Sequence, residues 1–256
     1  MHIDFGSSVI VVTGGATSIG LSISNQLAAS GAHVVVCDVL EDEGIKTVEA
    51  ILKNGGSAEF HALDVTSEAD WQKLVNKIEA GPRISGLVNN AGVGGALGVT
   101  EETMDGWTHI TNVNQVGVFL GMKHIGPLIE SGGGGAIVNL ASIFSTSGGF
   151  GNAIAYHASK GAVMAMTRTA AVHWSTKGVR VNAIHPGFIG TPMTLQHKDL
   201  MLESGQTLGE LILSGTPMKR LGTPEEIANV VTFMLAPQAS YLTGASVYVD
   251  GGWSAI

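Results

Sequence analysis

The N-terminal part of the chain combines three features that few folds accommodate together. Residues 9–12 form a β-branched run that is typical of a buried strand. A glycine-rich turn from Thr13 to Gly20 follows at once, and a helical stretch from Leu21 to Ser30 ends at Gly31 in the C′ position. The backbone of such a turn can approach a pyrophosphate, whose charge faces the helix N-terminus. The unit predicts the start of a dinucleotide-binding fold; for the turn alone, a purely structural tight turn is the alternative.

Apolar runs separated by helical stretches continue along the chain. The expected strands are His33–Cys37, Ala58–Val65, Ile84–Val88, Ala136–Leu140, Val179–Ile184 and a last strand with its turn at Ser246–Gly252. Expected helices are Asn112–Ile129 and one that is N-capped by Thr223, has Pro224 at its first position and runs to about Ala236. The 256 residues suit one large domain better than two. The pattern predicts an α/β fold: a three-layer, Rossmann-like, doubly wound parallel sheet in a single domain, residues 1–256.

An acidic residue ends the second expected strand. Asp38 lies about 20 residues past the glycines, where a carboxylate accepts hydrogen bonds from the adenosine ribose hydroxyls. Its charge would repel a 2′-phosphate, and the residues that follow it, Val-Leu-Glu-Asp-Glu, include no Lys or Arg. Asp38 therefore favours NAD over NADP. The alternative is that this carboxylate caps the next helix.

Polar residues also end the third and fourth expected strands. Asp64 and Val65 close the third, and Asn89-Asn90-Ala91-Gly92 follows the fourth. In an open parallel sheet, ligands bind at the carboxyl edge, near the point where the strand order reverses. Both segments are expected at that edge, although an Asn-Gly sequence alone also suits an ordinary turn.

A tyrosine and a lysine four residues apart, Tyr156 and Lys160, begin the helical run after a glycine-rich segment. On a helix this spacing places both side chains on one face. A phenol is a poor base at neutral pH, and a nearby ammonium is expected to lower its pKa. A tyrosine tuned in this way can exchange a proton with an alcohol or a carbonyl. For the two residues alone, an ordinary helix with a surface lysine is the alternative.

Taken together, the motifs resemble those of a known family. They are Thr13-Gly14-x5-Gly20, Asp64-Val65, Asn89-Asn90-Ala91-Gly92, Asn114-x2-Gly117, Ser142, Tyr156-x3-Lys160 and Pro186-Gly187. In order and spacing, over essentially the whole length, the chain resembles a short-chain dehydrogenase/reductase of the classical type. There is one departure: Ser18 stands where the family has the middle glycine of its first turn. Its hydroxyl can bind a phosphate, but its Cβ can crowd a backbone that favours glycine, which bears on cofactor affinity.

The resemblance implies a set of functional residues. The catalytic group would be Asn114, Ser142, Tyr156 and Lys160, with Asn114 interrupting its helix to hold a water in a proton relay to the lysine. Ser142 would orient the substrate oxygen toward Tyr156, and Lys160 would also bind the nicotinamide ribose. The cofactor site would comprise Gly14, Ser18, Ile19, Gly20, Asp38, Asp64, Val65, Asn90, Ala91, Gly92, Tyr156, Lys160, Pro186, Gly187, Ile189 and Thr191. Hydride transfer to or from NAD is the expected chemistry.

The substrate is expected to be apolar. Pocket candidates are Ser142, Phe144, Phe150, Ile154, Phe188 and Met193, and a lid over them is expected at about residues 188–215. Ordinary surface helices are the alternative for that segment. The segments around Ser142 and Pro186 resemble those of bacterial dehydrogenases for cyclic alcohols, of hydroxysteroid dehydrogenases and of aryl-alkyl carbinol dehydrogenases. The sequence thus predicts an NAD-dependent enzyme that interconverts a secondary alcohol, cyclic or aryl, and its ketone.

Composition excludes other classes of partner. A net charge of −8 with 13 Lys and Arg argues against a nucleic-acid surface, and the single Cys37 excludes a disulfide framework. The nine His residues form no metal-ligand motif, so no metal is expected, and His157 and His185 are interpreted as structural. No signal peptide and no apolar run long enough to span a membrane are evident, which favours a cytoplasmic protein. The family resemblance implies a homotetramer.

Two other functions were weighed. A 3-oxoacyl-(acyl-carrier-protein) reductase would be expected to use NADPH and to carry a basic docking patch, against which Asp38 and the few Lys and Arg residues argue. A non-catalytic NAD(H)-binding sensor would be expected to lack Tyr156 or Lys160, and both are present.

Overall fold

A parallel sheet of seven strands organises the part of the chain that the computed structural model describes, residues 3–6, 8–196, 198–202 and 205–256. The strands are β1 Val9–Thr13, β2 His33–Asp38, β3 Ser57–Ala62, β4 Ile84–Asn89, β5 Gly135–Leu140, β6 Val179–Pro186 and β7 Ser246–Val249. Their order across the sheet is β3-β2-β1-β4-β5-β6-β7, and every neighbouring pair is parallel.

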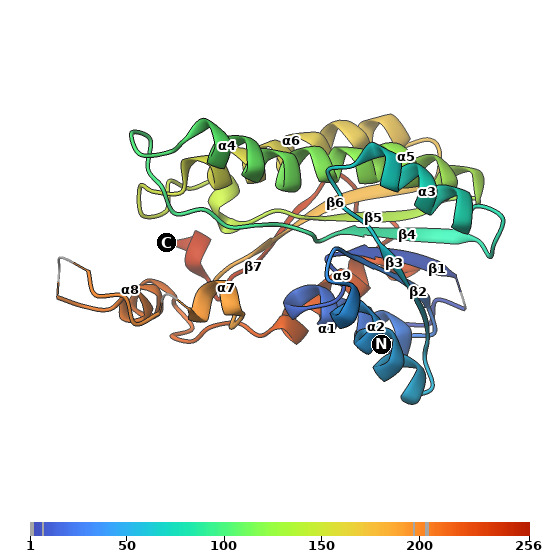
Figure 1. The fold of residues 1–256 in the computed structure, drawn as a ribbon, viewed down its shortest axis with the longest axis horizontal. Helices are drawn as coiled ribbons and strands as arrows, with labels where there is room; N and C mark the ends of the chain where they lie inside the picture. The colour runs from blue at the N-terminus through green and yellow to red at the C-terminus, as the bar shows by residue number, and fades with distance from the viewer. Residues whose placement is uncertain (1–2, 7, 197, 203–204) are drawn as a thin grey trace.

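Helices cover both faces of this sheet (Figure 1). On one face lie α1 Ser18–Ala29, α2 Glu41–Lys53 and α9 Pro224–Leu235; on the other lie α3 Glu68–Ile78, α4 Met104–Thr111, α5 Gly117–Ser131 and α6 Ile154–Trp174. Two shorter helices, α7 Pro192–Leu195 and α8 Leu208–Gly215, project beyond the sheet, and the C-terminus lies between them and the layer of α4 and α6. The predicted three-layer, doubly wound α/β fold is confirmed.

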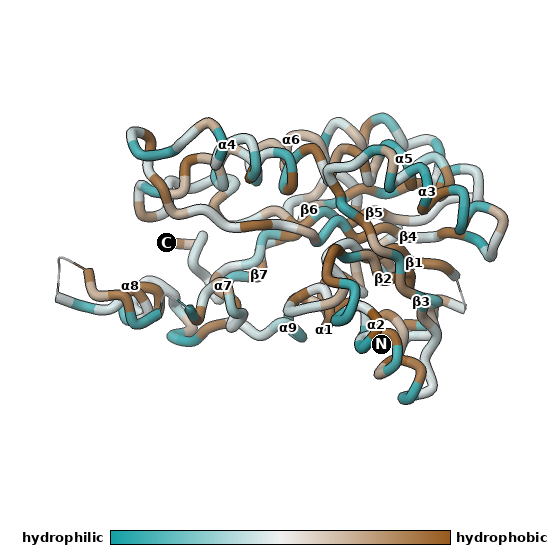
Figure 2. The backbone as a smooth tube through the Cα atoms, viewed as in Figure 1, coloured by the Kyte–Doolittle hydropathy of each residue, from teal (hydrophilic) through white to brown (hydrophobic). Residues whose placement is uncertain are grey.

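Strands buried on both faces explain the unbroken apolar runs in the sequence. Along β1, Val9 and Val11 face the core under α3, α5 and α6, whereas Ile10 and Val12 face the core under α1 and α9. Figure 2 shows the hydrophobic colour along the central strands, whereas hydrophobic and hydrophilic colours alternate along the helices. In the described residues, no helix is both long and apolar enough to cross a membrane.

The order in which strands are added to the sheet reverses between β1 and β4. From β1 the chain builds outward to β2 and β3, then returns to place β4 on the other side of β1. The carboxyl ends of these two strands therefore diverge into helices on opposite faces and leave a crevice between them. The two segments that the sequence predicts at this edge, after β3 and β4, lie around that crevice.

Several elements differ from the sequence prediction by one or more residues, and three of the differences lie near the cavity. Helix α1 begins at Ser18 rather than at Leu21, so the end of the glycine-rich turn is already helical. Strand β3 ends at Ala62, which leaves Asp64 and Val65 in the loop beyond it. The predicted helix Asn112–Ile129 is two elements: a π-helical turn, η1 Asn112–Val116, and then α5.

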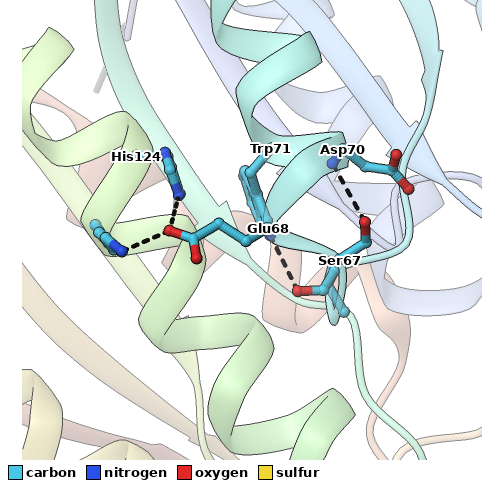
Figure 3. Close-up of polar contacts among 7 residues, drawn as sticks. Ser67, Glu68, Asp70, Trp71 and His124 are labelled. Atoms are coloured by element: carbon cyan, nitrogen blue, oxygen red, sulfur yellow. Dashed lines mark hydrogen bonds and ion pairs between the residues drawn. The ribbon is translucent and has the colours of Figure 1, made fainter.

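Contacts at the start of α3 fix the loop that carries Val65 (Figure 3). The indole Nε1 of Trp71, a fully buried residue, donates to the carbonyl of Val65 at 3.0 Å. The Ser67 hydroxyl accepts from the amide of Asp70 and caps the helix. Next to it, Glu68 accepts from His124 Nε2 on α5 at 3.1 Å and from Lys123. The loop after β3 is thus held against α5.

Candidate active site

A cavity of about 650 Å³ opens at the carboxyl edge of the sheet, at the reversal point between β1 and β4. Every residue that the sequence assigned to the cofactor lines it, together with Ser142 and Met193. The structure therefore brings the ends of β1, β2, β4, β5 and β6 and the start of α6 to one site. Five of the predicted residues lie outside the lining of this cavity: Asn114, Phe144, Phe150, Ile154 and Phe188.

The glycines of the first turn are required by close backbone contacts. Gly14 has φ of +60°, and a Cβ on Gly20 would lie 1.9 Å from the carbonyl oxygen of Gly14. Asn90 holds this turn, because its Nδ2 donates to the carbonyls of Thr13 and Gly14 at 2.9 Å each. The loop after β4 and the turn after β1 therefore form one rigid wall of the cavity.

Ser18 adopts a strained backbone conformation in this turn. It is the first residue of α1 and has φ of +51°, in the left-handed region that disfavours residues with a Cβ. Its predecessor Thr17 is the N-cap, and its side chain makes no capping hydrogen bond. Thr17 and Ser18 both line the cavity, so two hydroxyl-bearing residues stand where the amide groups of the helix N-terminus are unpaired.

Asp38 is fixed at the end of β2 by two backbone amides. One carboxylate oxygen accepts from the amide of Ala16 and the other from the amide of Leu40, each at 3.1 Å. The side chain is 92% buried, since only 8% of the residue is exposed. Its nearest neighbours along the chain, Val39 and Leu40, are exposed apolar residues that also line the cavity. The carboxylate is therefore rigid, and these two neighbours offer no positive charge to a phosphate.

Asn114 interrupts the helix, in agreement with the expected distortion. It is fully buried in the π-turn η1; its Oδ1 accepts from the amide of Val93 at 2.8 Å, and its Nδ2 donates to the Val93 carbonyl at 2.9 Å and to the Ser159 hydroxyl at 3.1 Å. A Cβ on Gly92 would lie 3.2 Å from Asn114 Oδ1 and 3.4 Å from Lys160 Nζ. Asn114 thus sits behind the cavity wall, close to the lysine.

The expectation that Lys160 lowers the pKa of Tyr156 is wrong for this structure. Burial raises the pKa of Tyr156, and a hydrogen bond with Ser142 opposes that only in part. Lys160 Nζ lies 5.8 Å from the centre of the Tyr156 ring and donates to the carbonyl of Leu140 at 2.7 Å. Burial also lowers the pKa of Lys160 to about 8. The two side chains do share one face of α6, as their spacing predicted, but the burial of the phenol outweighs its hydrogen bond with Ser142 and raises its pKa.

Ser142 begins a short 3-10 turn, η2 Ile143–Ser145, immediately after β5. Its hydroxyl accepts from the amide of Phe144 at 3.1 Å, while its own amide donates to the Ser145 hydroxyl at 3.2 Å. This reciprocal pair is a capping box. Because Ser142 also hydrogen-bonds Tyr156, the turn places its hydroxyl beside the phenol.

The predicted aromatic pocket residues form a cluster beside Tyr156. The Phe144 ring meets the Tyr156 ring edge-on at a centroid distance of 6.4 Å, and Phe188 lies 5.8 Å from Phe144. Trp253, which the sequence analysis missed, completes the cluster at 4.9 Å from Phe188 and 5.8 Å from Phe150. The one sequence signal for Trp253 as a pocket residue was its position just after the last strand, at the same carboxyl edge of the sheet. Met193, the remaining pocket candidate, is half exposed and lines the cavity from α7.

Other cavity residues also escaped the sequence analysis. His109 on α4 and Val113 on η1 line the cavity four residues apart, on one helical face. That spacing next to Asn114 was the available signal. In the described part of the chain, no group of three or more His, Cys, Asp or Glu residues could hold a metal ion.

The segment predicted as a lid contains α7 and α8, so the alternative of ordinary helices describes its secondary structure. Within residues 188–215, positions 197, 203 and 204 lie outside the described residues. Helix α8 has a capping box between Thr207 and Glu210, and its last residue, Gly215, packs against Trp253; a Cβ there would lie 2.5 Å from the indole.

Comparisons with known proteins agree with this geometry. Residues 14–254 match a family model described as enoyl-(acyl carrier protein) reductase. A cyclopentanol dehydrogenase of Comamonas sp. (strain NCIMB 9872) is 38% identical over 248 residues, which cover 96% of this chain and 97% of that protein.

Two solved structures show the same fold. The structure of levodione reductase has a TM-score of 0.91 and 34% identity, and covers 98% of this chain and 99% of its own. A structure from Beutenbergia cavernae, described as an NAD(P)-dependent gluconate 5-dehydrogenase with bound NADP at low occupancy, has a TM-score of 0.92 and 31% identity over the whole of both chains. From its motifs, its fold and these relatives, the chain belongs to the short-chain dehydrogenase/reductase family of oxidoreductases, which use nicotinamide cofactors.

Proposed function

We propose that this protein interconverts an apolar secondary alcohol, cyclic or aryl, and its ketone, with NAD as the hydride carrier and Tyr156 as the general acid and base. The observation that carries the proposal is that Ser142, Tyr156 and Lys160 line the same cavity as the glycine-rich turn and Asp38. A proton-transfer group and a dinucleotide cradle in one cavity are what a coupled hydride and proton transfer requires.

The residues present fit a dinucleotide. Gly14 and Gly20 keep the turn free of side chains where a pyrophosphate would approach, and the N-terminus of α1 faces the same space. Asp38 would hold the adenosine ribose, and Ile189 and Thr191 would hold the carboxamide. When bound, the nicotinamide supplies the hydride donor or acceptor at its C4 carbon.

Tyr156 would move the proton while Ser142 orients the substrate oxygen. In alcohol oxidation the phenolate accepts the hydroxyl proton; in ketone reduction the phenol returns it to the oxygen. Lys160 would bind the nicotinamide ribose, and its lowered pKa of about 8 allows its ammonium to give up a proton near neutral pH. Asn114, fixed behind Gly92, would hold the water that continues the relay.

Asp38 supports NAD over NADP. Its buried carboxylate is held by two amides, so it cannot turn away from a 2′-phosphate without losing both bonds. We expect kcat/KM with NAD to exceed that with NADP by about 100-fold, because an uncompensated charge in a buried site costs several kcal/mol. Replacing Asp38→Asn should narrow this ratio by about tenfold or more. Equal use of both cofactors by the wild-type protein would contradict the assignment.

The aromatic cluster beside Tyr156 supports an apolar substrate. Phe144, Phe188 and Trp253 offer ring faces and edges, which favour a cyclic hydrocarbon or an aryl group. The experiment is a panel of secondary alcohols with NAD: cyclopentanol, cyclohexanol, 1-phenylethanol, gluconate and a 3-hydroxyacyl thioester. We expect turnover of the first three. Exclusive turnover of gluconate would contradict the apolar assignment, and exclusive turnover of the thioester would favour an acyl-carrier-protein reductase.

We also propose that residues 188–215 act as a lid and that the chain assembles as a homotetramer. The lid proposal is supported by exposed apolar residues on this segment, among them Leu195, Leu200 and Met201. The assembly proposal is supported by β7, which is an edge strand, and by exposed apolar residues near it such as Tyr241 and Val172. Light scattering coupled to size-exclusion chromatography tests the assembly, and a monomer would contradict it.

A further inference from the structure

His185 is a buried histidine that the proposed chemistry does not use. It lies on β6 with none of its surface exposed, one residue before the Pro186-Gly187 segment of the cavity wall. Its Nδ1 is 2.8 Å from the carbonyl oxygen of Ser142, and its ring stacks on that of Tyr248 with a centroid distance of 4.5 Å. His185 therefore joins the wall of the cavity to the turn that presents Ser142.

The hydrogen bond fixes the tautomer of His185. A carbonyl oxygen only accepts, so Nδ1 must carry the proton. Burial lowers the pKa of His185, and the cations Arg168 and Lys160 act in the same direction, against the hydrogen bond to Ser142. The ring is therefore neutral, and Nε2, which has no hydrogen-bond partner in the described part of the chain, carries the lone pair.

The turn after β5 is tied down at more than one point. His185 holds the carbonyl of Ser142, while the hydroxyl of Tyr248 lies 2.9 Å from that of Thr146, at the end of the turn. His185 and Tyr248 are register partners on β6 and β7, so their stacked rings act together. Between these two ties, the capping box sets the conformation of Ser142 itself.

We propose that His185 is a positioning residue: its Nδ1–H holds the carbonyl of Ser142 so that the Ser142 hydroxyl points at the substrate oxygen beside Tyr156. This inference rests on the proposed function, in which Ser142 orients the substrate. The Ser142 carbonyl also accepts from the amide of Ser145 at 3.0 Å, so the loss of His185 removes one of its two donors. The peptide is then held by one hydrogen bond instead of two, and its rotation costs less. Rotation of the Ser142 peptide would move the hydroxyl away from the phenol, and small misplacements of this kind reduce kcat strongly.

Two variants separate the hydrogen bond from the packing of the ring. His185→Phe keeps a ring to stack on Tyr248 but loses the donor, and His185→Asn keeps a donor near the Nδ1 position but loses the ring. We expect His185→Phe to lower kcat by at least about tenfold with little change in KM, and His185→Asn to stay within about threefold of wild type. A purely structural role predicts the reverse order, because the Phe variant preserves the packing better.

His33→Phe is the matched control. It also replaces a histidine whose Nδ1 makes a hydrogen bond, in this case with the Ser57 hydroxyl at 2.7 Å. His33 and Ser57 are the first residues of β2 and β3, at the edge of the sheet opposite the cavity, so kcat should remain unchanged. Binding of NADH, followed by its fluorescence, should remain within about twofold of wild type in all three variants, because none of them alters the glycine-rich turn or Asp38. Equal loss of kcat in the Phe and Asn variants, or no loss in either, would overturn the proposal.

Hydrogen exchange provides a readout that needs no substrate. Amides of Phe144 and Ser145 are bonded to the hydroxyl and the carbonyl of Ser142, so they report on the turn. Their exchange should accelerate at least about tenfold in His185→Phe and remain near the wild-type rate in His185→Asn. Unchanged exchange in the Phe variant would refute the role of His185, even if the wild-type protein oxidised none of the alcohols. Retained activity in a Tyr156→Phe variant would instead refute the proposed function and leave the exchange result standing.

Discussion

The two halves of the site, the cavity and the aromatic cluster beside it, are built by different means. On the cofactor side, Asn90 Nδ2 donates to the carbonyls of Thr13 and Gly14 at 2.9 Å each. A Cβ added at Gly14 or Gly20 would lie 2.9 Å or less from a backbone atom of the β1–α1–β4 unit. On the substrate side, Phe144, Phe188 and Trp253 come from three distant segments and meet only through ring contacts of about 5 to 6 Å. The cofactor side therefore does not tolerate a Cβ at Gly14 or Gly20, whereas on the substrate side one aromatic side chain can be replaced by another.

The largest effect that this contrast predicts is for Gly20→Ala. The added Cβ would lie 1.9 Å from the Gly14 carbonyl, and backbone cannot yield to such a contact. We expect NADH affinity to fall at least about 100-fold or the protein to lose several kcal/mol of stability. Gly148→Ala is the control, because a Cβ there meets nothing within 4 Å. NADH titration measures the affinity of each variant, and thermal unfolding measures its stability. Normal NADH binding by Gly20→Ala would show that the cofactor side is not rigid.

Trp253→Ala tests the opposite side. Removing the indole opens space between Phe188 and the end of α8. The ratio of kcat/KM for bulkier alcohols to kcat/KM for cyclohexanol should therefore rise about tenfold. NADH affinity should stay within about twofold, because the indole contacts no part of the glycine-rich turn. Trp107→Ala, on the exposed side of α4, is the control. An unchanged substrate ranking, or a large loss of NADH affinity, would break the proposed division between the two sides.

The pH dependence of kcat/KM also tests this division, because the two titrating groups, Tyr156 and Lys160, lie where the two halves meet. Burial raises the pKa of Tyr156, so the phenolate needed for alcohol oxidation becomes more abundant as the pH rises. We expect kcat/KM for oxidation to increase by up to about tenfold per pH unit from about pH 7 upward, and the rise to flatten near pH 8, where Lys160 loses its charge. Ketone reduction, which needs the protonated phenol, should not show this increase. Oxidation that is independent of pH would contradict the assignment of Tyr156.

The smallest effect is expected for Ser18→Gly. Glycine adopts the left-handed conformation of this position without strain, which should stabilise the protein by about 1 kcal/mol. NADH affinity should change by less than about threefold, since a lost hydroxyl contact and a relieved backbone oppose each other. Ala153→Gly, at φ of +59° in the N-cap of α6, is a matched control that should gain similar stability without reaching the cofactor. Loss of stability in Ser18→Gly would show that the serine hydroxyl holds the turn.

The same contrast explains which parts of the molecule could be predicted. The strands and the parallel sheet follow from local patterns, because buried strands and turns such as that of Gly14 and Gly20 leave a signature within a few residues. The full set of cofactor residues was implied by the family resemblance and stays a prediction. Trp253 and the direction of the pKa shift of Tyr156 depend on segments far apart in sequence and on how deeply the phenol is buried. Asn114 is an intermediate case. The family resemblance implied that it interrupts its helix, but the π-helical form of the interruption and its bonds to Val93 and Ser159 are known only from the structure.

Replacement of Tyr156 by phenylalanine is the sharpest test of the proposed proton transfer, because it removes one hydroxyl and leaves the ring in place. We expect kcat for a cyclic alcohol to fall by at least about 1000-fold, as for loss of a proton-transfer group. The dissociation constant of NADH, measured on the same sample by fluorescence titration, should stay within about threefold of wild type. A Tyr156→Phe variant that keeps most of its turnover would show that Tyr156 is not the proton-transfer group.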